Sequence, residues 1–149
     1  MKVTYDKKEF FKDSESITTP KVLLNVCDPY QYNITDSNIF YSNYYTTPEK
    51  VWKSGNRNMG SISIDKIFSY HIICNMICID LPKTQWNLVP FKYKYFELCC
   101  KKLKEYCDSN DIKLIASPIF GTEVIEGNWK KIISILNSHF PNFHLLIYK

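Results

Sequence analysis

Residues 112–129 read IKLIASPIFGTEVIEGNW, and this stretch decides the fold. Ile112 to Ala116 is short and apolar, which predicts a buried strand. A loop containing Gly121 and Gly127 follows, and Trp129 then opens a helical pattern. Such a loop brings backbone N–H groups and the positive end of a helix dipole together, which suits an anion. The segment Ser117–Asn128 is therefore a candidate anion-binding loop, although two glycines are also common in turns that bind no ligand.

The segments on either side of this stretch alternate between helix and strand. Phe91 to Cys107 carries apolar residues at helical spacing, with lysines on the opposite face. From Trp129 to Phe140 apolar residues recur at i, i+3, i+4, i+7 and i+11, which predicts a second helix. Phe143 to Tyr148 reads as a final strand. This alternation favours parallel strands with helices covering the sheet.

The first half of the chain supplies the remaining strands. Val22 to Val26 and Tyr70 to Ile79 are apolar without alternation, which fits strands covered on both faces. Ser61 to Ile64 alternates, and Asp65–Ser69 separates it from the next strand, so we expect a hairpin. The shorter predicted elements are a strand at Val3–Tyr5, a helix near Ser37–Tyr45 and a helical turn at Pro48–Lys53 capped by Thr47.

These elements predict one α/β domain over residues 1–149, a three-layer α/β/α sandwich. The hairpin makes the sheet mixed and excludes an all-parallel one. We expect Val22–Val26 and Ile112–Ala116 to be adjacent or nearly so at the centre, because both runs are continuously apolar.

The composition fits a folded domain with an anionic ligand. The 149 residues are 45% hydrophobic and 23% charged, which excludes wholesale disorder. The formal charge of +4 is far below what nucleic-acid binding usually needs, so nucleic acid is not an expected partner.

Localisation and cysteine chemistry are also bounded by the sequence. No apolar run approaches the roughly 18–20 residues that span a bilayer, and the N-terminus has no apolar signal core. We therefore expect a cytoplasmic protein without a membrane partner. The six cysteines lack paired metal-ligand spacing, so we expect reduced, buried thiols, no metal site and no cofactor.

Several motifs occur in the same order along the chain as in one known family. Val3–Phe11 resembles an opening strand followed by a K-G-D-L-F turn, and Asn75-Met76-Ile77 resembles an N-M-I-G-Q run. Pro118–Trp129 resembles the loop P-x-I-G-C-G-L-x-G-G-D-W. On these motifs the chain resembles the macro domain family. The similarity is to the short branch that includes the terminal ADP-ribose glycohydrolases and their bacterial and phage relatives.

The resemblance implies a site for ADP-ribose or a related small nucleotide. Glu9 stands where the family's aspartate contacts adenine, and Tyr30 and Tyr32 could stack on a base or ribose or simply pack. The implied ligand-binding residues are Glu9, Asp28, Tyr30, Tyr32, Asn33, Asn75, Gly121, Thr122, Glu123, Gly127 and Asn128.

Departures from the family pattern argue against ordinary turnover. Tyr32–Thr35 has no glycine where the family has Gly-x-Gly, so side chains would crowd backbone that must approach the ligand. The branch's catalytic lysine and aspartate fall near Asn75 and Ile125, which cannot do the same chemistry. Glu123 replaces a glycine, and its carboxylate would repel a diphosphate. The remaining catalytic candidates are Glu126, Glu123 and Asn75.

Three functions stay open at this point. The first is a divergent macro domain that binds ADP-ribose or a derived nucleotide. Its Lys-, Asn-, Ile- and Tyr-rich composition is compatible with an AT-rich viral or phage genome, and so with a role against host ADP-ribose-based signalling. The second is a hydrolase of ADP-ribosyl or ADP-ribose-phosphate bonds that uses Glu126 or Glu123. The third is a catalytically dead pseudo-macro domain that works through protein contacts.

Overall fold

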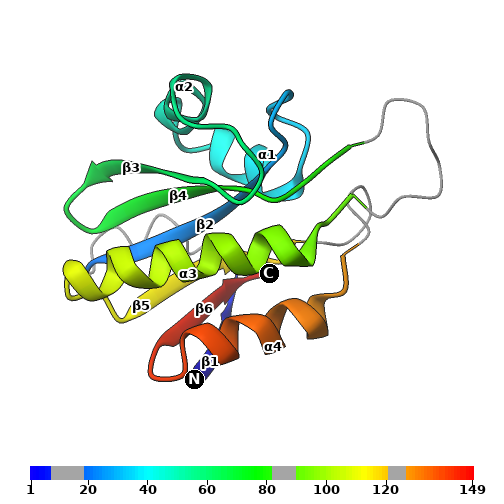
Figure 1. Ribbon diagram of the computed structural model, residues 1–149. Helices are drawn as coiled ribbons and strands as arrows, with labels where there is room; N and C mark the ends of the chain where they lie inside the picture. Colours follow the sequence, from blue (N-terminus) through cyan, green and yellow to red (C-terminus); the bar gives the residue numbers. More distant parts are fainter. Residues whose placement is uncertain (8–18, 82–89, 121–126) are drawn as a thin grey trace.

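The computed structural model describes residues 1–7, 19–81, 90–120 and 127–149 (Figure 1). The strands of this part form one sheet in the order β1-β6-β5-β2-β4-β3. Every neighbouring pair is parallel except the antiparallel pair β3–β4. The predicted mixed sheet is therefore confirmed. The strands are β1 (Lys2–Asp6), β2 (Lys21–Cys27), β3 (Ile62–Phe68), β4 (His71–Ile77), β5 (Leu114–Pro118) and β6 (His144–Tyr148).

Helices cover both faces of the sheet, which confirms the three-layer architecture (Figure 1). On one face, α3 (Tyr93–Ser109) and α4 (Trp129–His139) pack on the larger apolar cluster, to which β2 contributes Val22, Leu24 and Val26. On the other face, α1 (Asp36–Ser42) packs on a cluster that contains Leu23. The helix α2 (Thr47–Ser54) lies on this second face too and buries Trp52 against the end of β2.

The strands β2 and β4 lie in the interior of the sheet and every residue of both is buried. Their pairing runs over seven residues, from Lys21↔His71 to Cys27↔Ile77. On its other side β2 pairs with β5 at Val22↔Ile115 and Leu23↔Ala116, so the predicted adjacency is confirmed.

Three predicted boundaries are wrong, each for a local reason. The strand expected at Ile112–Ala116 begins only at Leu114, because Asp111 has a left-handed backbone (φ 55°) and the Ile112 N–H still bonds the end of α3. The turn expected at Asp65–Ser69 is part of β3, because Asp65 and Lys66 pair with β4. Thr47 lies inside α2 and is not its cap, since the N-cap is Thr46.

The six cysteines are all buried and none is in a disulfide, as expected. Within the described ranges no three His, Cys, Asp or Glu side chains gather into a group that could hold a metal ion. None of the helices in this part of the chain has both the length and the apolar character that a bilayer crossing requires.

Candidate functional site

The parallel strands β2, β4 and β5 end at the same edge of the sheet. Two predicted ligand segments follow β2 and β5 at this edge: Asp28–Thr35, the first loop, and Ser117–Asn128, the second loop. Pairing between β2 and β5 stops at Leu23↔Ala116, although β2 continues to Cys27 and β5 to Pro118. The two strands therefore separate toward their carboxyl ends. In open α/β sheets, ligands bind in a crevice outside the carboxyl ends of the strands. The crevice lies between neighbouring strands whose following connections run to opposite sides.

Side chains of α1 and of its N-cap residue Thr35 replace the missing strand pairing of β2. The Thr35 hydroxyl donates to the Val26 carbonyl (2.8 Å), and the Val26 N–H donates to the Ser37 hydroxyl (3.0 Å). The Tyr41 hydroxyl donates to the Leu24 carbonyl at 2.9 Å. Buried backbone N–H and C=O groups need hydrogen-bond partners. These contacts supply partners, so β2 separates from β5 without leaving these backbone groups unpaired.

Asp28 fixes the first loop at this edge. One carboxylate oxygen accepts the N–H groups of Tyr30 (2.8 Å) and Gln31 (3.0 Å), and the other accepts that of Leu81 (3.0 Å). Asp28 is 1% exposed, so these three charge-assisted bonds occupy its carboxylate. It therefore ties the loop after β2 to the segment after β4, and positions the edge rather than presenting a free charge to a ligand.

Asn75 belongs to a buried polar network behind the edge. Asn25 and Asn75 lie opposite each other on β2 and β4, and the Asn25 amide donates to the Asn75 oxygen at 2.9 Å. The Asn75 amide donates to the Pro48 carbonyl (3.1 Å) and the Ser63 hydroxyl (3.2 Å). Asn75 is 0% exposed and its polar atoms all have partners inside the protein. This arrangement does not support the prediction that Asn75 touches a ligand or takes part in catalysis.

Tyr32 turns inward from the first loop. Its hydroxyl accepts the Asn25 amide at 3.0 Å, and its ring lies 5.3 Å from the Trp52 ring, between centroids. Burial raises the pKa of the Tyr32 phenol well above its usual value, so the group stays neutral. The packing alternative for Tyr32 is therefore the one the structure favours, whereas Tyr30 is 77% exposed.

Asn33 gives the glycine-free first loop a left-handed backbone turn. Its φ of 62° lies in the left-handed region, which asparagine tolerates better than most residues. Its side-chain oxygen accepts the Ser42 hydroxyl at 2.6 Å, which holds the loop against α1. The glycine-free first loop thus makes its sharp turn at Asn33.

The second loop enters α4 through Asn128. The Asn128 side chain caps the helix by accepting the Lys131 N–H (3.2 Å), and its own N–H donates to the Tyr93 hydroxyl (2.7 Å). The Lys131 ammonium lies 4.0 Å from the centre of the Tyr93 ring. These contacts join the first turn of α4 to the first turn of α3 beside the edge.

No family model matches the sequence, and no curated protein matches it at a significant level. Solved structures do match over nearly the whole chain. A Bacteroides thetaiotaomicron protein of unknown function is 16% identical with a TM-score of 0.80, covering 99% of this chain and 98% of its own. A Streptomyces coelicolor macrodomain protein is 13% identical with a TM-score of 0.76, covering 99% of both chains. The macrodomain of Mycobacterium tuberculosis DarG is 20% identical with a TM-score of 0.70, covering 98% of this chain and 96% of its own.

The chain has the macrodomain fold. The likeness extends to an Oceanobacillus iheyensis macrodomain solved with ADP, which is 11% identical with a TM-score of 0.53 and covers 88% of this chain and 76% of its own. The resemblance inferred from the motifs is thereby confirmed at the level of fold.

The described part of the chain holds only some of the predicted site residues. Asp28, Tyr30, Tyr32 and Asn33 share the first loop, while Gly127 and Asn128 lie at the start of α4. The other candidates lie outside the described residues: Glu9, Gly121, Thr122, Glu123 and Glu126.

The sequence analysis missed the residues that shape the first loop from behind. They are Asn25, Ser37, Asn38 and Trp52, whose indole N–H donates to the Asp28 carbonyl at 2.9 Å. One signal was present, since Asn25 interrupts an otherwise apolar strand and a buried amide needs partners. That signal gives no indication of which partners those are.

Proposed function

We propose that this macrodomain binds ADP-ribose or an ADP-ribose-derived nucleotide between the Asp28–Thr35 and Ser117–Asn128 segments. The observation that carries the proposal is the whole-chain match to macrodomain structures, one of which contains ADP. The separation of β2 and β5 at their carboxyl ends supports the same place, because it opens the sheet between the two loops.

The start of α4 favours an anionic part of the ligand. The first four N–H groups of a helix lack internal partners, and the Asn128 side chain satisfies one of them, that of Lys131. The helix dipole adds positive potential there, and the Lys131 side chain adds a cation nearby. A diphosphate placed at this end would meet donors rather than carboxylates of the described residues.

Binding is proposed in preference to turnover. Asp28 and Asn75 have their side-chain polar atoms occupied inside the protein, so neither offers a general acid or base. Glu126 and Glu123 are the remaining carboxylate candidates for hydrolysis. A role for the protein in a virus or phage, against host ADP-ribose-based signals, is part of the same proposal and rests on composition alone.

Calorimetric titration of ADP-ribose, ADP and cyclic ADP-ribose derivatives tests the proposal. We expect ADP-ribose to bind wild type. Gly127→Val is expected to weaken it, because a β-branched side chain would stand where the phosphates approach the backbone. Glu9→Ala is expected to cost about 1.5–3 kcal/mol, the value of a charge-assisted hydrogen bond to the adenine amine.

Glu105→Ala is the matched control for Glu9→Ala, because Glu105 is exposed on α3 and its loss removes the same charge. Each variant is melted first, so that loss of binding is separated from loss of folding. If wild type ignores every ligand, or if both site variants bind as wild type does, the cleft is not the site. The third function, a pseudo-macro domain that works through protein contacts, is then favoured. Release of ADP-ribose from a modified protein that disappears in Glu126→Ala would instead establish the hydrolase.

A further inference from the structure

A second hollow lies beside α2 and shares the first loop with the proposed cleft. Its volume is about 490 Å³, within the usual size of small-molecule sites. The first loop and α2 line it, together with the turn that follows α2; the lining residues are Tyr30, Tyr32, Glu49, Lys50, Trp52, Lys53 and Arg57. The helix α2 belongs to the layer opposite α4, so the hollow and the start of α4 lie on different faces of the sheet.

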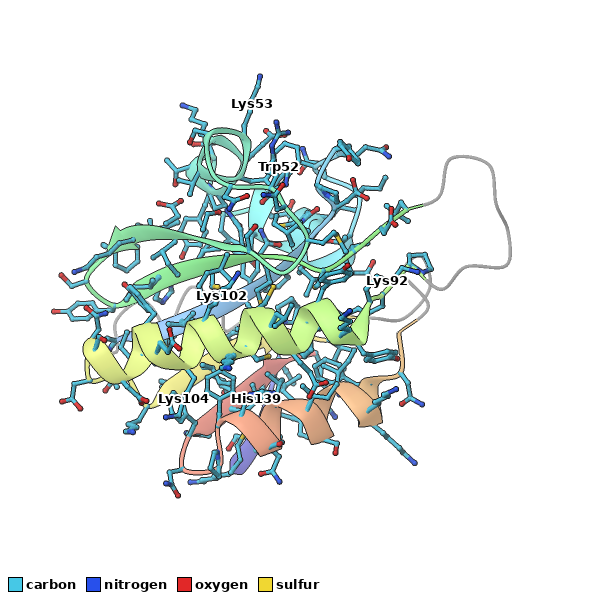
Figure 2. The ribbon with its side chains drawn as sticks, viewed as in Figure 1. Trp52, Lys53, Lys92, Lys102, Lys104 and His139 are labelled. Atoms are coloured by element: carbon cyan, nitrogen blue, oxygen red, sulfur yellow. The ribbon has the colours of Figure 1, made fainter. Side chains whose placement is uncertain are left out.

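The hollow carries a net positive charge. Lys50, Lys53 and Arg57 stand against the single carboxylate of Glu49, and all four side chains are exposed. Among the residues that the structure describes, none of the three cations forms an ion pair. Figure 2 shows Lys53 extending from α2 into solvent while Trp52 lies below it. Three cations around one hollow, none paired with a carboxylate of the described residues, favour an anionic ligand.

Arg57 is held in place by a stack of rings. Its guanidinium carbon lies 5.0 Å from the centre of the Trp52 ring, and Trp52 in turn packs on Tyr32. Trp52 is 6% exposed, and its indole N–H bonds the Asp28 carbonyl, so this platform is fixed from beneath. A guanidinium covered on one face keeps its edge free, and that edge donates two parallel hydrogen bonds to phosphate oxygens.

Tyr30 adds an aromatic surface to the same hollow. Its ring is 77% exposed, while its backbone N–H is fixed by Asp28. An exposed aromatic ring beside a cluster of cations is the combination that binds nucleotides, with the base on the ring and the phosphate on the cations. An acidic peptide would use the cations and leave this ring without a partner.

We propose that the hollow beside α2 is a second binding site, which takes the phosphate and base of a nucleotide. The phosphate lies against Arg57, Lys50 and Lys53, and the base stacks on Tyr30. Two kinds of molecule present this phosphate and base: a free mononucleotide, and the 5′-phosphorylated end of a single-stranded nucleic acid.

Amide NMR spectra of the full chain test this site. AMP at millimolar concentration is expected to shift the signals of Tyr30, Lys53 and Arg57, and both adenosine and inorganic phosphate are expected to bind more weakly than AMP. Lys50→Gln combined with Lys53→Gln is expected to weaken AMP about tenfold, which corresponds to about 1.4 kcal/mol, or about 0.7 kcal/mol for each of two exposed charge contacts. Tyr30→Ala is expected to weaken AMP at least about fivefold through lost stacking.

Lys66→Gln combined with Lys101→Gln is the matched control, since it removes the same charge from exposed positions on β3 and α3. This control is expected to bind AMP as wild type does. A 5′-phosphorylated oligonucleotide is titrated beside AMP; whichever binds more tightly identifies the source, provided the Lys50/Lys53 variant weakens both.

The proposal is overturned if AMP leaves these three signals unchanged, or if the control weakens AMP as much as the Lys50/Lys53 variant does. It is also overturned if adenosine binds as well as AMP, or if a polyglutamate peptide displaces AMP with tighter affinity.

Discussion

Asp28→Asn isolates the charge of the carboxylate that fixes the first loop. Asparagine has nearly the same shape as aspartate, so the change creates neither a cavity nor a steric clash. The amide has only one acceptor oxygen. If that oxygen keeps the N–H groups of Tyr30 and Gln31, the amide NH₂ group faces the N–H of Leu81, donor against donor.

The expected loss follows from this count of bonds. One charge-assisted bond, worth about 1.5–3 kcal/mol, disappears. The other two become neutral, and neutral hydrogen bonds are about half as strong as charge-assisted ones. Together these changes are expected to lower the free energy of unfolding by about 3–6 kcal/mol. For a domain of this length that lowers Tm by roughly 6–24 °C.

Urea and thermal unfolding at neutral pH measure this loss, and Asp111→Asn is the control. Asp111 is exposed and has a φ of 55°, a conformation that asparagine also accepts. The control removes the same charge and is expected to change stability by less than about 0.5 kcal/mol. In Asp28→Asn the amide of Leu81 is also expected to lose protection from hydrogen exchange, because its acceptor has gone.

An Asp28→Asn protein as stable as Asp111→Asn would refute this reasoning. So would a loss of stability with unchanged protection at Leu81, because the carboxylate would then act elsewhere than across the two segments.

Two further predictions concern the interior. Asn75→Ala removes the hydrogen bonds of Asn75 to the Pro48 carbonyl, the Ser63 hydroxyl and the Asn25 amide, and is expected to cost about 2–4 kcal/mol in urea unfolding; a double-mutant cycle with Asn25→Ala that shows no coupling would contradict the network. Burial raises the pKa of the Cys99 and Cys107 thiols to about 12, whereas thiols of the unfolded chain ionise near pH 8.5. The contribution of these two buried thiols to stability is therefore complete below about pH 8.5 and is lost as the pH rises toward 12. We expect the free energy of unfolding to fall in that window with a smaller slope in Cys107→Ala, and an equal slope in both proteins would contradict this.

The arrangement of layers could be predicted because it depends on patterns that the chain carries locally. The apolar runs at Val22–Val26 and Tyr70–Ile79 indicated strands covered on both faces, and the helical spacing from Trp129 to Phe140 indicated the helix beside them. Boundaries were less predictable. Asp65 and Lys66 look like turn residues, yet pairing with β4 keeps them in the strand, so a tertiary contact overrides their local preference.

The ligand contacts of the candidate site stay predictions, whereas the internal partners of its residues could not be predicted. Asp28 and Tyr32 were assigned to a ligand, with packing as the alternative for Tyr32, and both bond groups inside the protein. Leu81 is 53 residues from Asp28, and Asn25 meets Tyr32 only because β2 and the first loop fold against each other. A polar residue at a sheet edge can serve a ligand or hold the edge itself, and its type and spacing are the same in both cases.

The glycine-free first loop still contains a left-handed turn. Tyr32–Thr35 lacks the glycine pair of the family, which suggested a loop too crowded for a ligand. Asn33 has a φ of 62°, a conformation that glycine adopts most readily and that asparagine tolerates. The Asn33 side chain does not stand free, because its oxygen accepts the Ser42 hydroxyl on α1. The loop therefore has a sharp turn and an anchor, so a glycine-free first loop is compatible with a fixed edge beside the separated ends of β2 and β5.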